Sequence, residues 1–306
     1  EKGEFCFADV DSLGTIEEKD FTDAHLDAVL ALPAVDAGAV RKAGFKVALD
    51  AVNSVGGIIM PRLLQRLGVE CVCVNCDPTG QFAHNPEPLP ANLVELSEAV
   101  VANKADLGIS VDPDVDRLAL ICEDGQPFGE EYTLVSVADY LLSRVYDEAL
   151  HTGKSMEEIA APYAMTTSSN LSSSRALRDV TEQYGGEYFA AAVGEVNVTT
   201  RMKECSCLIG GEGNGGVIYP ALHYGRDAMV GVALFLTNLA YKKMKVSELR
   251  ATYPEYVIAK NKIELSDKTL IDKILEKVKE EYAAEDINTI DGVKISFESR
   301  KEWVHL

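Results

Sequence analysis

The chain has 306 residues, of which 47% are hydrophobic and 25% charged, a composition typical of a soluble globular protein of about two domains. Its formal net charge of −20 at pH 7 argues against nucleic acids and anionic membranes as partners, because such a field would repel both. The sequence shows no membrane span and no signal peptide, so we expect a cytoplasmic protein with reduced thiols.

The first part of the chain predicts one α/β domain. Residues 1–38 are acidic and contain a helical pattern at 21–32. From residue 39 the pattern runs strand, helix, strand, helix, strand, strand, helix. We expect strands at 45–50, 69–74, 106–111 and 118–122 and helices at 58–67, 92–103 and 132–145. This alternation favours a mainly parallel sheet covered by helices, and we assign it to residues 39–150.

A similar pattern follows in residues 151–254 and predicts a second α/β domain. We expect strands at 159–165, 188–193, 207–210 and 217–219 and helices at 171–184, 196–203 and 227–243. From residue 255 a strand near 256, a charged helix at 268–282 and strands at 293–297 and 303–306 predict part of a third domain. The expected fold class is therefore α/β: two tandem three-layer α/β domains with mixed sheets, plus the start of an α+β domain.

The strongest chemical signal is the acidic loop Asp112-Pro113-Asp114-Val115-Asp116-Arg117 between two apolar strands. In an extended strand its three carboxylates would stand about 7 Å apart, and in a helix the middle one would point away. Only a curled loop, which Pro113 favours, brings them together. Converging carboxylates repel unless a cation neutralises them, so the loop predicts a divalent metal site. A solvated acidic turn is the alternative.

A second signal is the glycine-rich loop from Gly211 to Gly216, which carries Glu212 and Asn214. Glycines let the backbone approach a ligand, and these two side chains offer the acceptors and donors that suit sugar hydroxyls. A hairpin turn that merely needs glycines explains the pattern equally well. Downstream, Asp227 is expected to cap the helix at 227–243, and the preceding Arg226 is a candidate phosphate contact.

The cysteines form no recognisable motif apart from Cys73 and Cys76, which have the spacing of a redox or zinc pair. No second such pair and no histidine cluster accompanies them in the sequence. The surrounding run alternates Val and Cys and predicts a buried strand, so we expect core thiols.

Together the two loops resemble those of the α-D-phosphohexomutase superfamily. Residues 112–117 are similar to its metal loop, D-G-D-G/A-D-R, and residues 211–216 to its sugar loop, G-E-x-S-G-H. Two further stretches agree, Asp50 to Gly56 and Pro78 to Pro88. The G-E-G-N-G-G form of the second loop looks like that of archaeal-type phosphoglucosamine mutases.

The resemblance implies a four-domain enzyme that moves a phosphoryl group between the C1 and C6 hydroxyls of a hexose phosphate. In such enzymes the transfer uses a phosphoserine and a bisphosphorylated intermediate. The implied site residues are Asp112, Asp114 and Asp116 for Mg²⁺, Arg117 at the reacting centre, and Glu212, Asn214, Gly216 and Arg226 for the substrate.

The resemblance also sets expectations about what surrounds these residues. Neither a nucleophilic serine loop nor an R-x-S-G-T phosphate loop occurs in the sequence. We therefore expect residues 1–38 to end a missing first domain, 255–306 to begin a fourth, and the chain alone to be inactive. The implied partners are a hexose or hexosamine phosphate and those missing domains. A non-catalytic sugar-phosphate-binding protein on the same scaffold is the alternative.

Overall fold

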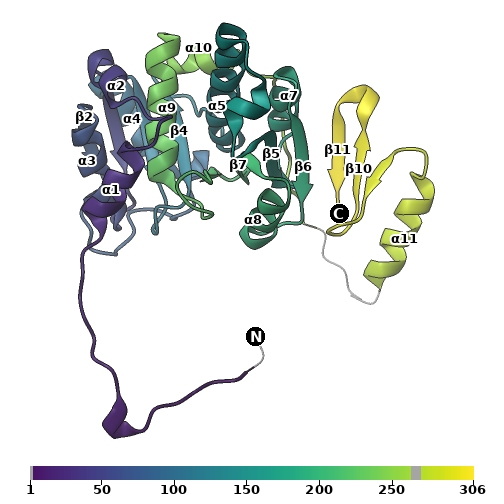
Figure 1. The fold of residues 1–306 in the computed structure, drawn as a ribbon, viewed down its shortest axis with the longest axis horizontal. Helices are drawn as coiled ribbons and strands as arrows, with labels where there is room; N and C mark the ends of the chain where they lie inside the picture. The colour runs from purple at the N-terminus through teal and green to yellow at the C-terminus, as the bar shows by residue number, and fades with distance from the viewer. Residues whose placement is uncertain (1–2, 263–269) are drawn as a thin grey trace.

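A computed structural model describes residues 3–262 and 270–306 (Figure 1). It contains two four-stranded sheets of the same topology, with strand orders β2-β1-β3-β4 and β6-β5-β7-β8. A small sheet of order β11-β10-β9 follows. The expected fold class is confirmed as two tandem α/β units with mixed sheets, followed by a small third sheet.

The first sheet is mixed, because β1 pairs in parallel with β2 and β3 whereas β4 runs antiparallel to β3. Alternate strand residues face opposite sides of the sheet. On one side Ala48 and Ile121 pack with Leu96 of α4, and on the other Leu49 lies in the main core with Leu63 of α3. The elements are α1 (Thr22–Leu30), α2 (Ala37–Ala43), β1 (Lys46–Asp50), α3 (Gly56–Arg66), β2 (Glu70–Val74), α4 (Val94–Asn103), β3 (Leu107–Val111) and β4 (Leu118–Cys122).

The second sheet repeats this arrangement. β5 pairs in parallel with β6 and β7, and β8 runs antiparallel to β7. Helix α8 covers one side, where Val198 and Met202 pack with Cys207 and Ile218. The elements are α5 (Glu130–Thr152), α6 (Met156–Ala160), β5 (Ala164–Asn170), α7 (Ala176–Gln183), β6 (Glu187–Ala191), α8 (Glu195–Glu204), β7 (Cys207–Glu212), β8 (Gly216–Ile218), α9 (Ala228–Lys242) and α10 (Val246–Ala251).

Helix α5 contacts both sheets, with neighbours in β4, β7 and β8, and it also packs against α7 and α9. One continuous hydrophobic core therefore includes Leu120 of the first sheet, Ile209 of the second, and Leu134 of α5. Because this core is shared, the loops that follow β3 and β7 are held close to each other.

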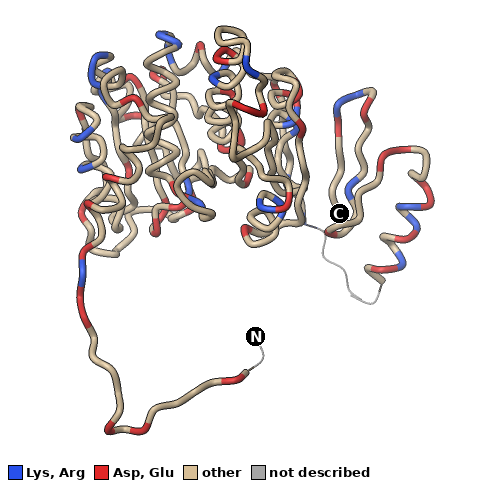
Figure 2. Tube along the Cα trace, viewed as in Figure 1, with Lys and Arg blue, Asp and Glu red and all other residues tan. Residues whose placement is uncertain are grey.

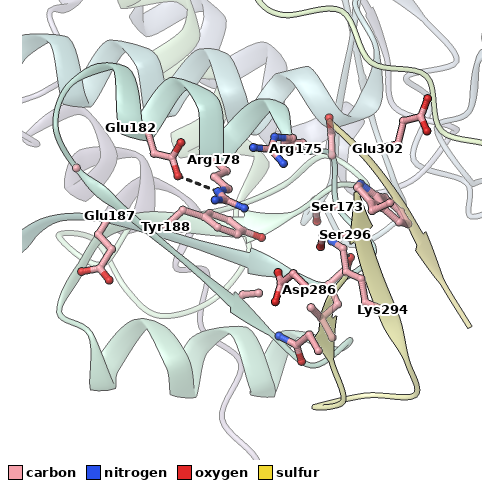
Figure 3. A pocket seen from close by; sticks show the side chains of 16 residues that line it. Ser173, Arg175, Arg178, Glu182, Glu187, Tyr188, Asp286, Lys294, Ser296 and Glu302 are labelled. Atoms are coloured by element: carbon pink, nitrogen blue, oxygen red, sulfur yellow. Dashed lines mark hydrogen bonds and ion pairs between the residues drawn. The ribbon is translucent and has the colours of Figure 1, made fainter. Parts of the chain in front are cut away.

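The small third sheet is antiparallel and lies beside the second one (Figure 1). Its elements are α11 (Ile271–Glu281), β9 (Asp286–Asn288), β10 (Lys294–Phe297) and β11 (Glu302–His305). Lys294 Nζ donates to the carbonyl oxygen of Leu171 at 2.7 Å, and His305 Nδ1 lies 2.9 Å from Ser172 Oγ. Between the two parts is a cavity of about 370 Å³. In Figure 3, Tyr188 on one side of this cavity faces Lys294 on the other.

Some expected elements are wrong. The strand expected at 159–165 begins only at Ala164, and residues 159 and 160 belong to α6, because Ser155 and Glu158 make a capping box that starts a helix. Helix α2 and strand β9 were not expected. Residues 254–262 form neither helix nor strand, so the strand near 256 is absent. The first residues of the helix expected at 268–282 lie outside the described part of the chain.

The cysteine prediction also needs correction. Strand β2 lies at an edge of its sheet, where it has a neighbour on one side only. Cys73 is therefore exposed and Cys71 and Cys76 are half-buried, instead of forming a buried strand. All seven cysteines are free.

Two general properties of the molecule are the distribution of its acidic residues and the apolar length of its helices. Figure 2 shows acidic residues in every part of the described chain, from the N-terminal segment to α11, in keeping with the net charge of −20. Within residues 3–262 and 270–306, no helix combines the length and apolar character needed to cross a bilayer.

Candidate active site

The three aspartates of the acidic loop converge between β3 and β4. One carboxylate oxygen from each of Asp112, Asp114 and Asp116 lies within 4.8 Å of the other two. The loop is curled because Val115 adopts a φ of +63° and because Asp112 Oδ1 accepts two backbone N–H groups. These come from Asp116 and Arg117, both at 3.0 Å. The predicted convergence is confirmed.

The electrostatics of this loop suit a cation. Burial, the neighbouring Asp112 carboxylate and a hydrogen bond with it raise the pKa of Asp116 to about 7. Burial opposes ionisation of Asp112 as well, but the backbone and side-chain hydrogen bonds from Arg117 lower its pKa. Asp116 Oδ1 is buried and has no hydrogen-bond partner among the described residues, although Arg117 Nε lies 3.7 Å away. A hard divalent cation would satisfy this oxygen and relieve the repulsion, so the donor set fits a metal site.

Arg117 connects the acidic loop to a distant segment. Its Nε donates to Asp112 Oδ2 at 2.6 Å, and its Nη1 donates to Glu87. Glu87 lies in the stretch 78–88, which matched the superfamily pattern but was not expected to reach the metal loop. The two carboxylates hold the guanidinium beside the aspartates.

Glu212 is the last residue of β7 and its side chain is buried. Its Oε1 accepts a hydrogen bond from Asn170 Nδ2 at 2.9 Å, and its Oε2 lies 3.1 Å from Arg226 Nη1. Asn170 ends the neighbouring parallel strand β5, and carboxyl ends of parallel strands meet at one edge of a sheet. Glu212 is thus held from both sides.

The other residues of the glycine-rich loop shape its backbone. Asn214 Oδ1 accepts the N–H of Gly216 at 3.2 Å, so this side chain closes the turn. A Cβ on Gly216 would lie 2.4 Å from Arg226 Cδ, so the missing side chain makes room for the arginine. Gly215 has a φ of +90°, and its carbonyl oxygen accepts the N–H of Leu118 at 3.0 Å. This last bond joins the glycine-rich loop to the first residue of β4.

Arg226 unites the two loops into one site. Its Nη2 lies 2.5 Å from Asp116 Oδ2, and its Nη1 lies 3.1 Å from Glu212 Oε2. Glu195 of α8 forms a third ion pair, with Oε2 at 3.4 Å from Arg226 Nε. The structure therefore brings all the expected site residues, those of the acidic loop, the glycine-rich loop and Arg226, to one place.

Glu131 is a site residue that no sequence pattern indicated. It lies in the first turn of α5, and its Oε2 accepts the N–H of Ser174 at 2.8 Å. A Cβ on Gly213 would lie 2.1 Å from the same oxygen, so the carboxylate packs directly against the glycine-rich loop. Burial raises the pKa of Glu131 to about 7. An acidic residue at a helix start is ordinary in sequence, and only the tertiary contact distinguishes this one.

Two family models match the chain. The alpha/beta/alpha domain II of phosphoglucomutase/phosphomannomutase matches residues 23–125, and the alpha/beta/alpha domain III matches residues 134–256. A probable phosphoglucosamine mutase of Methanopyrus kandleri is 29% identical over 99% of this chain. A phosphoglucomutase/phosphomannomutase of Thermococcus kodakarensis is 32% identical over 98% of it. The chain spans 62% of the length of each of these relatives.

Solved structures are similar over most of the chain. A phosphoglucomutase/phosphomannomutase family protein of Burkholderia thailandensis has a TM-score of 0.73 at 25% identity, covering 92% of this chain and 56% of that one. An Aspergillus fumigatus N-acetylphosphoglucosamine mutase, in complex with GlcNAc-6P and magnesium, has a TM-score of 0.57 at 15% identity. That match covers 88% of this chain and 59% of the other, and it shows a shared fold.

Proposed function

We propose that this chain, which belongs to the phosphoglucomutase/phosphomannomutase family, forms the metal-binding and sugar-binding part of a cytoplasmic phosphohexomutase. The reaction is the transfer of a phosphoryl group between the C1 and C6 hydroxyls of a hexose phosphate, through a phosphoserine and a bisphosphorylated sugar. The observation that carries this proposal is Arg226, because it pairs with the acidic loop and with Glu212 at once. A site for phosphate chemistry and a site for a sugar are thereby adjacent.

Asp112, Asp114 and Asp116 would hold the cation, and Mg²⁺ is the proposed ion because all three ligands are carboxylates. The Aspergillus mutase, which contains magnesium, supports this choice. When bound, the ion supplies Lewis-acid stabilisation of negative charge on phosphoryl oxygens. Arg117, held by Asp112 and Glu87, adds a fixed positive charge next to the same place.

Glu212 is the proposed acceptor for sugar hydroxyls. Asn170 and Arg226 fix the orientation of its carboxylate, and each oxygen retains a lone pair for a hydroxyl donor. Asn214 and Gly216 would complete the sugar contact, and Arg226 would face a substrate phosphate. Glucose, mannose and glucosamine phosphates are the candidate substrates, and the Methanopyrus relative favours the last of these.

A calorimetric titration with Mg²⁺ tests the metal assignment. We expect Asp114→Asn and Asp116→Asn to weaken binding by about tenfold or more, because each removes a charged oxygen ligand. Asp147→Asn, at an exposed position of α5, is the matched control and should bind like the wild type. Equal binding by all four proteins would refute the metal site.

A mutase assay tests the reaction. We expect the 306 residues alone to show no turnover of hexose 1-phosphates with a bisphosphate activator, since the sequence contains no serine-nucleophile loop. In a longer protein that also carries the serine loop, Glu212→Gln should reduce kcat/KM by an amount equivalent to about 1–3 kcal/mol. Normal kinetics with a lower melting temperature would assign Glu212 to the turn instead.

A further inference from the structure

A second cluster of ligating side chains lies outside the acidic loop. It consists of His25 from α1, His223 from the loop before α9, and Asp227 at the start of α9. His25 Nε2 lies 2.8 Å from Asp227 Oδ2, and His223 Nε2 lies 3.1 Å from the same oxygen. One possible ligand atom from each of the three residues lies within 4.8 Å of those from the other two. The cluster joins segments about 200 residues apart in sequence, since His25 and Asp227 are separated by 202 positions.

We propose that this cluster binds a divalent transition metal, with Zn²⁺ as the representative ion. Two imidazole nitrogens and one carboxylate oxygen are the donor set that borderline ions such as Zn²⁺ prefer, whereas Mg²⁺ prefers oxygen alone. The chain would then hold two metals of different chemistry: a hard cation between the aspartates of residues 112–116 and a softer one here.

The two carboxylate oxygens of Asp227 have different partners, so an ion could bind one of them without disturbing the helix cap. Oδ1 caps α9 as expected from the sequence, accepting the N–H groups of Met229 at 2.8 Å and Val230 at 3.2 Å. Oδ2 faces the two histidines. Because the cap uses Oδ1, an ion at Oδ2 does not compete with the N–H groups of the helix start.

Access and charge also permit an ion. Asp227 is almost fully buried, but the His25 and His223 side chains are 29% and 42% exposed, so water can supply a fourth ligand. The nearest arginine in sequence, Arg226, is paired with Asp116, Glu212 and Glu195, so carboxylates already balance its charge.

The binding reaction requires both imidazoles to change tautomer. In the structure the Nε2 atoms of His25 and His223 both face the accepting carboxylate of Asp227, so each neutral ring carries its proton on Nε2. To bind an ion through Nε2, each ring must carry its proton on Nδ1 instead, and His223 Nδ1 then loses the N–H of Gly225, which donates to it at 3.0 Å. No proton is released from either neutral ring in this exchange. The ion would then fix α1 to the residue next to Arg226.

Titration of the 306-residue chain with Co²⁺ and Zn²⁺ tests the proposal. Tetrahedral Co²⁺ bound to nitrogen and oxygen absorbs in the visible range, whereas thiolate ligands add intense near-ultraviolet bands that would report the cysteines. We expect visible absorption in the wild type and Zn²⁺ binding weakened about tenfold or more in His25→Ala and His223→Ala. His151→Ala, a histidine of α5 outside the cluster, should match the wild type, and circular dichroism checks that each variant is folded.

Two further variants keep the test decisive. His223→Gln retains a polar side chain at the loop and should also lose Zn²⁺ binding. Asp116→Asn should bind Zn²⁺ normally while losing affinity for Mg²⁺, which separates this site from the acidic loop. Unchanged Zn²⁺ affinity and stoichiometry in folded His25→Ala and His223→Ala, or near-ultraviolet thiolate bands alone, would overturn the proposal.

Discussion

The acidic loop and the glycine-rich loop occupy equivalent places in two sheets of the same strand order. Each connects the third parallel strand of its sheet to the antiparallel edge strand, and each begins with a buried carboxylate that pairs with an arginine. Those carboxylates are Asp112, which directly follows β3, and Glu212, which ends β7. The shared topology therefore places a carboxylate at the same edge twice.

The two loops differ in what holds their shape. In the acidic loop a side chain does so, because Asp112 Oδ1 accepts two backbone N–H groups of its own turn. In the glycine-rich loop Asn214 Oδ1 likewise accepts the N–H of Gly216, but the loop also depends on missing side chains, because Gly213 packs on Glu131 and Gly215 on the backbone of Leu118. Turns at equivalent places in the two sheets can thus differ in function: one places carboxylates together for a cation, and the other, which is rich in glycines, leaves room for a larger ligand.

The largest expected effect on stability comes from adding a side chain where the glycine-rich loop packs closely against β4. Gly215→Ala should lower the free energy of unfolding by about 3 kcal/mol, because its Cβ would lie 2.4 Å from the carbonyl oxygen of Leu118 at a φ of +90°. Gly153→Ala is the control: its φ is +72° but no atom lies within 4 Å, so the cost should be about 1 kcal/mol. Urea unfolding measures both. Equal losses would mean that the contact between the loops adds nothing to backbone strain.

An effect of similar size, which depends on pH, is expected where the glycine-rich loop packs against Glu131. Burial raises the pKa of this carboxyl from 4.5 to about 7, so the folded state favours the protonated form. Wild-type stability should therefore fall relative to Glu131→Gln as the pH rises from about 4.5 to about 7, by about 3 kcal/mol in total. Urea unfolding between pH 4 and 8 measures this difference. Glu148→Gln, at an exposed position of α5, should show no such trend, and a pH-independent difference for Glu131→Gln would contradict the argument.

The smallest effect concerns the side chain that curls the acidic loop. Asp112→Asn should cost about 1.5 kcal/mol without metal, because its amide would place N–H donors against the donating Nε of Arg117. Asp114→Asn, at the exposed position of the same loop, should change stability by less than about 0.5 kcal/mol. Thermal unfolding of the two variants compares them directly. A larger loss for Asp114→Asn would show that repulsion, not hydrogen bonding, governs the loop.

The sequence predicts the positions of both loops well, because they lie between strands with clear apolar patterns and carry unusual side chains. Asp112, Asp114 and Asp116 converge as expected for a curled loop, and Asp227 caps α9. The approach of Glu87 to Arg117 and of Glu131 to Gly213 is not predictable in this way. Each contact joins segments that only the tertiary fold brings together, and neither acid stands out locally. The error in the start of the strand expected at 159–165 is different, since Ser155 and Glu158 have the spacing of a capping box, which can be recognised in the sequence.

Helix α5 has a consequence for how the molecule unfolds. It has 23 residues, and its buried face packs against β4 of the first sheet and against β7 and β8 of the second. Neither sheet can open fully without exposing part of this face, so the two should behave as one cooperative unit. In amide hydrogen exchange, the N–H groups in the middle of α5 should be among the slowest in the chain, matched by the central strands of both sheets. The amides of α11, in which no residue is buried, should exchange through far smaller local openings.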